Sequence, residues 1–413
     1  MSRSSKIHRQ YFDALETRSA DERASDLFQR LPQQISLAKS TIGYCAMLTG
    51  IDSEDITSLE ALGQLPVLRK SDLIKAQQES PPFGGFTIKQ PHQFAHIFQS
   101  PGPIYEPGEV SSDWWRLGRF LHAVGIGSDD IVQNCFSYHL TPAGMIFENA
   151  ARAVGAAVVP AGIGQTELQV TVAQDVGVTA YAGTPDYLKT LLNKADELGV
   201  TLGISKAAVG GGALLSSIRR YYAERGITCL QNYATADLGN IAYESSSSSG
   251  LIIDEHVIVE IVIPGTGDAV APGEVGEVLV TTLNPNYPLI RFATGDLSAF
   301  LDGQSPCGRT NQRIKGWMGR ADQSTKVKGL FVRPEQVAQL VASHPEIEKA
   351  RVVIGRENEI DTLVVQIETS SKEMDRFSDL VLRIFRLRGT VDLVEPHSLP
   401  SDGIVIEDQR SFD

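Results

Sequence analysis

Short apolar runs alternate with amphipathic stretches between residues 131 and 233, and this alternation constrains the fold more than any other feature. Each apolar run is followed by a stretch whose apolar side chains recur three and four positions apart, the spacing of one buried helix face. A repeated strand–helix order of this kind predicts a parallel sheet with helices on both faces. The predicted strands cover residues 131–136, 157–162, 179–185, 205–212 and 227–233, and the predicted helices cover residues 145–156, 166–177, 186–199 and 216–226.

The pattern changes after residue 251. Segments 256–263 and 274–283 are rich in β-branched residues, and a connector rich in Gly and Pro separates them. Two such runs joined by a turn predict an antiparallel or mixed sheet that is added to the parallel one. Before residue 75, helical spacing predicts amphipathic helices that each bury one stripe.

The C-terminal part has its own pattern. Two short strand-like runs, 351–355 and 363–367, are flanked by helical stretches, which predicts a compact α+β unit. We place its boundary between residues 319 and 322. The sequence therefore predicts an α/β protein with a large N-terminal domain, residues 1–319, and a small mobile C-terminal domain, residues 320–413.

Composition excludes several classes of function. The 413 residues include 37 Lys and Arg against 50 Asp and Glu, a net charge of −13. This argues against nucleic acid as a partner, because binding along a phosphate backbone needs a basic face. No apolar run reaches the ~18–20 residues of a membrane helix, and the first residues lack the apolar core of a signal peptide. The four cysteines lie far apart, which argues against a disulfide framework and predicts a reducing cytoplasm.

Common catalytic motifs are missing from the sequence. It contains no GxxxxGK[ST], GxSxG or HExxH pattern, and its eight His residues show no ligand-type spacing. Three other segments combine residues that suit nucleotide binding. They are the glycine turn 210–212 with the segment 232–237, the segment 291–297 that contains Asp296, and the basic strip 308–329.

Each of these three segments also has a structural interpretation. The glycine turn and the segment 232–237 follow neighbouring strands, and open α/β sheets bind ligands at such strand ends. Asp296 in a glycine-led turn is suited to accept hydrogen bonds from two ribose hydroxyls, but it would equally cap a turn. The basic strip is typical of phosphate contacts in an acidic protein, but it would equally be a solvated face.

Several segments, taken in order, resemble the phenylacetate–coenzyme A ligase family of the adenylate-forming superfamily. The resemblance is carried by residues 141–169, by Thr184-Pro185-Asp186-Tyr187, by residues 233–237, and most closely by residues 260–297, 307–322 and 326–341. It implies the fold of the adenylate-forming enzymes. It also implies ATP-dependent activation of an aryl or other carboxylic acid, through an acyl-adenylate, to its coenzyme A thioester.

The resemblance also implies cofactors and site residues. ATP or AMP, Mg²⁺ and coenzyme A would bind, with Asp237 as the Mg²⁺ ligand, Asp296 at the ribose hydroxyls and Asp322 at the hinge between the domains. Arg309 and Arg320 would lie near the nucleotide, and Lys326 and Lys328 near the coenzyme A phosphates. The residues expected around adenine and the α-phosphate are Gly211, Gly212, Asn232, Tyr233, Ala234 and Thr235. Phe136, Tyr138 and Tyr181 would line an apolar acid pocket, although aromatic residues at such positions are more often part of the core.

Three departures from the family pattern concern the chemistry. The phosphate loop, rich in Ser, Thr and Gly in the family, is here a proline-rich segment, residues 99–107, that includes Glu106. Proline has no backbone N–H to offer a phosphate. The family places a Lys after a glycine near the C-terminus, but here no Lys occurs from residue 388 to the end. Cys307 stands without the further cysteine of a zinc site, so we expect no zinc.

Three functions therefore stay open. The first is a working acid–coenzyme A ligase, an acid–thiol ligase whose adenylation step is weakened. The second is a non-catalytic relative that binds AMP, an acyl-adenylate or acyl-CoA as a sensor or partner subunit. The third is an acyltransferase of changed reaction. The resemblance implies a cytoplasmic homodimer that acts on a small acid and coenzyme A, without membrane or nucleic-acid partners.

Overall fold

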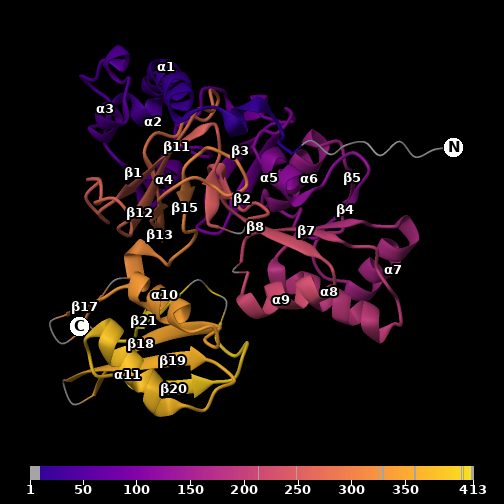
Figure 1. The fold of residues 1–413 in the computed structure, drawn as a ribbon. Helices are drawn as coiled ribbons and strands as arrows, with labels where there is room; N and C mark the ends of the chain where they lie inside the picture. Colours follow the sequence, from indigo (N-terminus) through magenta and orange to yellow (C-terminus); the bar gives the residue numbers. More distant parts are fainter. Residues whose placement is uncertain are drawn as a thin grey trace.

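The computed structural model describes residues 10–212, 214–247, 249–323, 325–327, 330–357, 360–400, 402 and 404–410. Figure 1 shows the chain as an upper body that contains the N-terminal helices and the central sheets, with a smaller body of C-terminal strands and helices below it. Across the described residues, we find no helix with the length and apolar character needed to cross a membrane.

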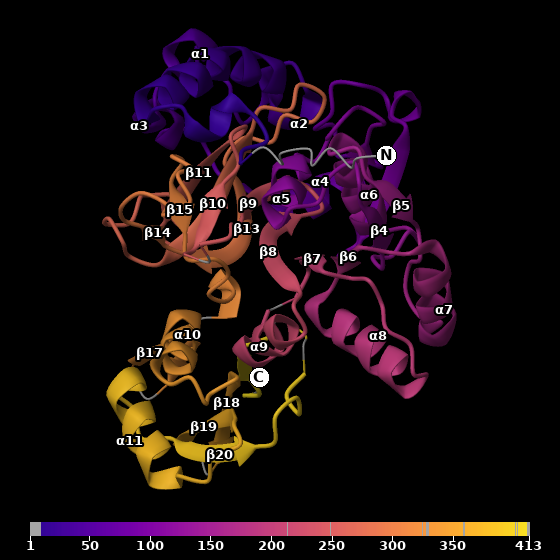
Figure 2. The same ribbon diagram turned by 45° about the vertical axis from the view of Figure 1, so that its right-hand side comes forward.

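The N-terminal helices cover one side of the upper body (Figure 2). The long helix α1 begins at a capping box in which the Ser19 hydroxyl accepts from the Glu22 amide and the Glu22 carboxylate accepts from the Ser19 amide. Its apolar face, with Leu31 and Ile35 fully buried, packs in one core cluster with strands of the sheets below. The elements here are η1 (Ala14–Thr17), α1 (Ala20–Lys39), α2 (Ile42–Cys45), η2 (Ser53–Asp55), α3 (Leu59–Gly63) and α4 (Lys70–Glu79).

The central sheet has a parallel half, as the strand–helix alternation predicts. The strands β5, β4, β6, β7 and β8 lie side by side in that order, and every neighbouring pair is parallel. Helices cover both faces. The strands are β4 (Ile131–Asn134), β5 (Ala157–Val159), β6 (Ala180–Gly183), β7 (Lys206–Val209) and β8 (Thr228–Thr235), and the helices are α5 (Gly118–Val124), α6 (Ala143–Ala153), α7 (Thr166–Val176), α8 (Pro185–Glu197) and α9 (Ser216–Glu224).

Strand β8 joins this parallel half to an antiparallel half. One edge of β8 pairs with β7, and the other pairs antiparallel with β9, with a register shift between Tyr233 and Ala234. A bulge of this kind turns the strand and re-aims its side chains. The remaining strands are β9 (Gly239–Tyr243), β10 (Leu251–Ile253), β15 (Arg313–Ile314) and β14 (Phe300–Leu301), in that spatial order.

A second sheet lies beside the first and carries the β-rich segments predicted after residue 251. Its order is β1 (Leu68–Arg69), β13 (Phe292–Ser298), β12 (Gly276–Thr282) and β11 (Val257–Val262). Every residue of β11 and β12 is buried, which explains their nearly continuous apolar sequence. Since β13 pairs antiparallel with β12 and parallel with β1, the predicted mixed sheet is confirmed.

The C-terminal elements form a sheet and a core of their own. Helices α10 and α11 pack on the sheet β20–β19–β18–β21, and the buried residues form one cluster from Val327 to Ile406. The elements are β16 (Thr325–Val327), β17 (Leu330–Val332), α10 (Pro334–Ser343), β18 (Lys349–Glu357), β19 (Ile360–Glu368), α11 (Met374–Phe385), β20 (Thr390–Val394) and β21 (Ile406–Asp408). A contact of 3.3 Å from the Ser217 hydroxyl to Glu348 links α9 to this body. The boundary near residue 320 stays a prediction.

Candidate functional site

Asp296 is the meeting point of three segments that are distant in sequence. The Tyr233 hydroxyl donates to it at 2.9 Å, the Trp317 indole N–H at 3.1 Å and the Arg320 guanidinium at 3.3 Å. Gly295 has a φ of +73°, and a Cβ there would lie 2.6 Å from the Arg320 guanidinium. Only a glycine therefore lets Arg320 approach this closely.

Tyr233 is held as a neutral hydrogen-bond donor. Burial raises its pKa well above the ordinary value, and the charge of Asp296 raises it further. Three of the predicted nucleotide residues, Tyr233, Asp296 and Arg320, are thus brought together. The carboxylate has about four lone-pair positions, so three donors leave it acceptor capacity.

The glycine turn lies against the next strand along the sheet. A Cβ on Gly210 would lie 2.4 Å from Oδ1 of Asn232, and one on Gly211 would lie 3.7 Å from the Phe136 ring. Gly211 also has a φ of +68°, a conformation that favours glycine. The structure therefore brings this turn, Asn232 and Phe136 together at the strand ends, as predicted for a ligand crevice.

The other members of these two segments lie close by. Gly212 is near Pro185, since a Cβ there would be 3.5 Å from the proline ring. Ala234 is half-buried and follows the bulge in β8. The Thr235 hydroxyl accepts from the Leu238 amide at 3.1 Å and so closes the turn that leads to Asp237.

The three aromatic residues predicted for the acid pocket do not share one cluster. The Phe136 ring stacks on Phe147 at 4.3 Å, and the Asn134 amide donates to the Tyr138 hydroxyl at 2.8 Å. Tyr181 lies in a different core cluster, and its hydroxyl donates to the Thr184 carbonyl at 2.9 Å. Phe136 thus lies near the glycine turn and Tyr138 near Gly144, whereas Tyr181 occupies a core position.

Asp237 belongs to a buried polar group that we call the Asp237 cluster, formed by Lys70, Ser100, Glu106 and Asp237. Its side chain is 0% exposed, and its Oδ2 accepts from Nζ of Lys70 at 3.2 Å. Its Oδ1 has no hydrogen-bond partner within the described part of the chain. A buried, unpartnered carboxylate oxygen fits a Mg²⁺ ligand, because Mg²⁺ binds oxygen.

Glu106 points inward and is 1% exposed. Burial raises its pKa to about 8, and the neighbouring charge of Asp237 contributes to the rise. The carboxyl group therefore keeps its proton at neutral pH and does not add the negative charge that the sequence leads one to expect. The Ser100 hydroxyl donates to its Oε1.

The segment in the place of the phosphate loop is a tight hairpin. Strands β2 (His96–Ser100) and β3 (Ile104–Gly108) pair antiparallel over their whole length, which places their backbone amides in a ladder. The hairpin turn and residues 139–141 border an open cavity of about 500 Å³. The short helix η3 (Pro91–Gln93) precedes the hairpin.

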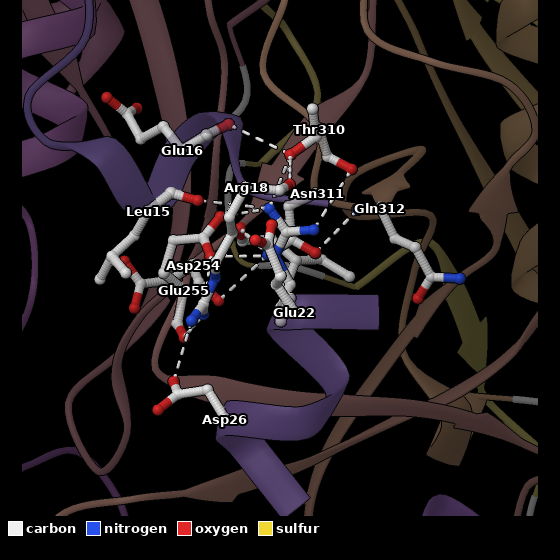
Figure 3. A network of polar contacts seen from close by, with 12 residues as sticks. Leu15, Glu16, Arg18, Glu22, Asp26, Asp254, Glu255, Thr310, Asn311 and Gln312 are labelled. Carbon is white, nitrogen blue, oxygen red and sulfur yellow. Dashed lines mark hydrogen bonds and ion pairs between the residues drawn. The ribbon is translucent and has the colours of Figure 1, made fainter. Parts of the chain in front are cut away.

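Arg309 forms a buried ion pair with the N-terminal segment. Its Nε is 2.5 Å from Oε1 of Glu16, and the Tyr243 hydroxyl donates to the same oxygen at 2.7 Å. Figure 3 shows the adjoining network, in which Thr310 and Glu255 meet Arg18 and the segment around Glu16. Through Arg309 and Thr310, this part of the basic strip therefore binds the N-terminal segment that contains Glu16 and Arg18.

Cys307 next to this pair is a half-buried thiol. Burial acts to raise its pKa, but hydrogen bonds with Ser245, Ser305 and Arg309 outweigh it, so the pKa is lowered. Among the described residues, no group of three or more His, Cys, Asp and Glu side chains is placed to hold a metal ion. The expectation of no zinc stays a prediction.

The last predicted residues lie at the limit of the described structure. Asp322 belongs to the short helix η4 (Ala321–Gln323) and Lys326 to β16, but their side chains are outside the described part. Lys328 is outside the described residues altogether. Their roles at the hinge and at coenzyme A stay predictions. Lys70 is a residue that sequence reasoning missed.

Comparison with known proteins adds to this geometry. No family model matches the chain. The phenylacetate-coenzyme A ligase of Thermus thermophilus is 29% identical over 339 residues, which span 78% of this chain and 75% of that protein. The phenylacetate-coenzyme A ligase of Escherichia coli is 27% identical over 383 residues, which span 88% and 86%. Over most of its length, the chain is therefore similar in sequence to phenylacetate-coenzyme A ligases.

Comparison with solved structures concerns the fold. A 2-hydroxyisobutyryl-CoA ligase in the postadenylation state, in complex with 2-HIB-AMP, matches with a TM-score of 0.80 at 22% identity, over 97% of this chain and 93% of that one. An open conformation of the same ligase with 2-HIB-AMP and CoA matches with a TM-score of 0.78, over 97% and 95%. The predicted fold class is confirmed.

Proposed function

We propose that this protein activates a carboxylic acid with ATP, through an acyl-adenylate, to its coenzyme A thioester. The observation that carries the proposal is the convergence of Tyr233, Trp317 and Arg320 on Asp296, at the strand ends where an α/β fold binds ligands. The curated relatives bear the name phenylacetate-coenzyme A ligase and are matched over most of their length. An aryl or other apolar acid is therefore the substrate class we favour.

Each residue at the strand ends contacts a different part of the nucleotide. Asp296 accepts hydrogen bonds from the ribose hydroxyls, while Tyr233 and Arg320 hold the carboxylate in place. Asn232 and the turn that contains Gly211 and Gly212 flank the adenine. Ala234 and Thr235 lead the chain toward the phosphate. Acyl transfer to a phosphate needs such preorganised donors, because charge develops on oxygen in the transition state.

Mg²⁺ is the metal that we propose for the ATP-bound state. Oδ1 of Asp237 is the protein oxygen that would hold it, since this buried atom lacks another described partner. When bound, Mg²⁺ neutralises charge on the departing pyrophosphate. Asp237 itself orients the ion, and Lys70 fixes the carboxylate through Oδ2.

Residues 320–413 are proposed to act as a small mobile domain next to the large domain of residues 1–319. Asp322 would be the hinge, and Lys326 and Lys328 would meet the coenzyme A phosphates. The isolated bridge between Asp296 and Arg320 lies at this boundary, so a rotation there would reach the nucleotide site directly. Domain rotation of this kind exchanges the groups that face the reacting carbonyl.

A second candidate function rests on the β2–β3 hairpin. Its prolines lack an N–H, and the amides of Gln99 and Tyr105 already donate to the Leu140 carbonyl and to Oε1 of Gln77, so it offers few donors to a triphosphate. The sequence also has no Lys from residue 388 to the end. The alternative is therefore a relative that binds AMP, an acyl-adenylate or acyl-CoA as a sensor or partner, or that transfers an acyl group supplied as a preformed adenylate or thioester.

The remaining proposals concern the setting of the protein. We propose a cytoplasmic homodimer that works on a small acid and coenzyme A, without nucleic-acid or membrane partners. The net charge of −13 supports the exclusion of nucleic acid. Sedimentation equilibrium of the purified protein tests the dimer, and a monomer across the concentration range would overturn it.

The test of the function has two stages. The purified protein is first titrated with ATP·Mg and with AMP by calorimetry. It is then incubated with ATP, coenzyme A and a panel of aryl and alkyl acids, and thioester is measured by chromatography. Binding of both nucleotides and thioester formation support the ligase. AMP binding without ATP binding or turnover favours the second candidate, and thioester from a synthetic acyl-adenylate without ATP favours the acyltransferase.

A further inference from the structure

Lys70 emerges at the nucleotide site, although no sequence motif assigns it a role. It is the first residue of α4 and follows β1 directly. β1 pairs in parallel with β13, and Arg69 lies opposite Ala293. Strand β13 continues past Ala293 into the irregular stretch that contains Asp296, so Lys70 leaves the sheet at the point where β13 begins to approach Asp296.

The ammonium group of Lys70 has donor capacity to spare. Nζ donates to Oδ2 of Asp237 at 3.2 Å, and no other described residue bonds it. An ammonium group has three donor positions. The Lys70 side chain is 35% exposed and that of Asp237 is 0% exposed, so the amine is the part of this ion pair that contacts solvent.

Unsatisfied polar atoms lie next to this ion pair. Oε2 of Glu106, Oδ1 of Asp237 and the Tyr287 hydroxyl are buried, and none has a hydrogen-bond partner within the described residues. Burial raises the pKa of Tyr287, and the charges of Asp237 and Glu106 raise it further, which places the three groups within electrostatic reach of one another. Since unpaired buried polar atoms are costly, this region is built for a polar occupant.

Lys70 makes the local charge more favourable for an anion. Asp237 is a buried carboxylate and repels a phosphate. The Lys70 ammonium offsets the charge of Asp237. The N-terminal end of the ten-residue helix α4 adds a partial positive charge at the same point.

We propose that Lys70 is a further nucleotide-binding residue whose ammonium group donates to an α-phosphate oxygen of AMP, ATP or an acyl-adenylate. The inference rests on the proposed function only in that a nucleotide binds beside Asp296. It places a fixed phosphate-binding cation in the N-terminal part of a chain that has no Lys from residue 388 onward.

The experiment compares AMP with adenosine, which share the base and ribose and differ in the phosphate. Both are titrated by calorimetry, in the presence of EDTA, into the wild type, Lys70→Ala and Lys75→Ala. Lys75 is exposed on the same helix and serves as the matched control. We expect Lys70→Ala to lower the affinity for AMP by about 10–100-fold, which is the effect of one charge-assisted hydrogen bond. The affinity for adenosine should not change.

A purely structural role for Lys70 would give a different result. If it only held Asp237, Lys70→Ala would change the affinities for AMP and adenosine equally or leave both unchanged, and either result overturns the inference. If it only neutralised Asp237, the AMP-specific loss would disappear in the double variant Lys70→Ala, Asp237→Asn, and that result overturns the inference as well. Lys70→Arg, which keeps the charge, should retain most of the preference for AMP. Lys70→Gln replaces Lys70→Ala if the latter fails to fold, because it keeps a hydrogen bond to Asp237.

The outcomes also separate this inference from the proposed function. A wild type that makes thioester, with an unchanged AMP-to-adenosine ratio in Lys70→Ala, overturns the role of Lys70 and leaves the ligase intact. A wild type without turnover whose AMP preference disappears in Lys70→Ala overturns the ligase and supports Lys70. If the wild type binds neither AMP nor adenosine, both the proposed function and the role of Lys70 are overturned.

Discussion

The Tyr233 hydroxyl donates a hydrogen bond of 2.9 Å to Oδ2 of Asp296 across the junction of two sheets. Tyr233 comes from β8 of the central sheet, and Asp296 comes from β13 of the second sheet. The bond therefore fixes the proposed ribose acceptor relative to the strand that carries Asn232 and Thr235. This phenol therefore links the two halves of the proposed nucleotide site.

Removal of that hydroxyl should be measurable as lost stability. Tyr233→Phe keeps the ring and removes the donor, so the free energy of unfolding should fall by about 1.5–3 kcal/mol, the usual range for a hydrogen bond to a charged group. Urea unfolding measures it. Tyr287→Phe is the control, since the Tyr287 hydroxyl is buried without a described partner and its loss should cost less. Equal losses would show that the bond to Asp296 adds nothing.

The role of Asp296 predicts a loss that does not depend on the phosphate. Asp296→Asn keeps an oxygen for Trp317 and Arg320, but its N–H₂ replaces the oxygen that accepts from Tyr233, and it removes one ribose acceptor. The affinities for AMP and for adenosine, measured by calorimetry, should both fall by about 10–100-fold, because both ligands contain the ribose. Asp302→Asn, at an exposed position of the same part of the chain, should bind as the wild type does. A loss restricted to AMP would contradict the ribose assignment.

Glu106 predicts a pH dependence of stability. Its pKa is raised from 4.5 to about 8, first by burial and then by Asp237. The folded state therefore keeps a proton that the unfolded chain releases, and the free energy of unfolding falls as the pH rises from about 4.5 to about 8. The largest slope from one group is about 1.4 kcal/mol per pH unit.

Substitution by glutamine isolates this contribution. Glu106→Gln cannot ionise, so it should be more stable than the wild type at pH 9, and the difference should shrink toward pH 5. Unfolding in urea at a series of pH values measures it. Glu109→Gln is the control, since Glu109 follows β3 directly, is partly exposed and pairs with Lys89. Parallel pH profiles for the wild type and Glu106→Gln would contradict the raised pKa.

Much of the fold follows from local pattern. The alternation between residues 131 and 233 predicts the strands β4 to β8 and their helices, because burial of a parallel strand on two faces requires a continuous apolar run. The same alternation pattern does not predict that an antiparallel half pairs with β8. This pairing depends on the bulge at Tyr233 and Ala234. The periodicity of apolar residues does not indicate with which edge of a sheet a strand will pair.

The site was less predictable than the fold. Asp296 and Tyr233 stand in recognisable motifs, and the structure brings them together. Lys70 comes from a helix start far from any motif, and only the pairing of β1 with β13 brings it toward Asp296. The inward orientation of Glu106 depends on the register of the β2–β3 hairpin, which a proline-rich sequence does not reveal.

The ion pair of Arg309 and Glu16 gives this part of the basic strip a structural role. Both side chains are buried, at 5% and 0% exposed, and one partner without the other leaves an uncompensated charge. Arg309→Met should lower the free energy of unfolding by about 3–5 kcal/mol, and Glu16→Gln in addition should recover part of the loss. AMP affinity of the folded variant should equal that of the wild type. A large loss of AMP affinity at full stability would instead place Arg309 at the nucleotide.

Gly295 tests how closely Arg320 must approach Asp296. Gly295→Ala meets two penalties, a φ of +73° and a Cβ 2.6 Å from the Arg320 guanidinium. Gly303→Ala is a matched control, because Gly303 has a φ of +78° and a Cβ there meets nothing within 4 Å. The backbone penalty of about 1–2 kcal/mol should appear in both variants as a lower free energy of unfolding. Only Gly295→Ala should also displace Arg320 and weaken AMP in calorimetry. If the two variants bind AMP equally, the contact between Arg320 and Asp296 does not support the ribose site.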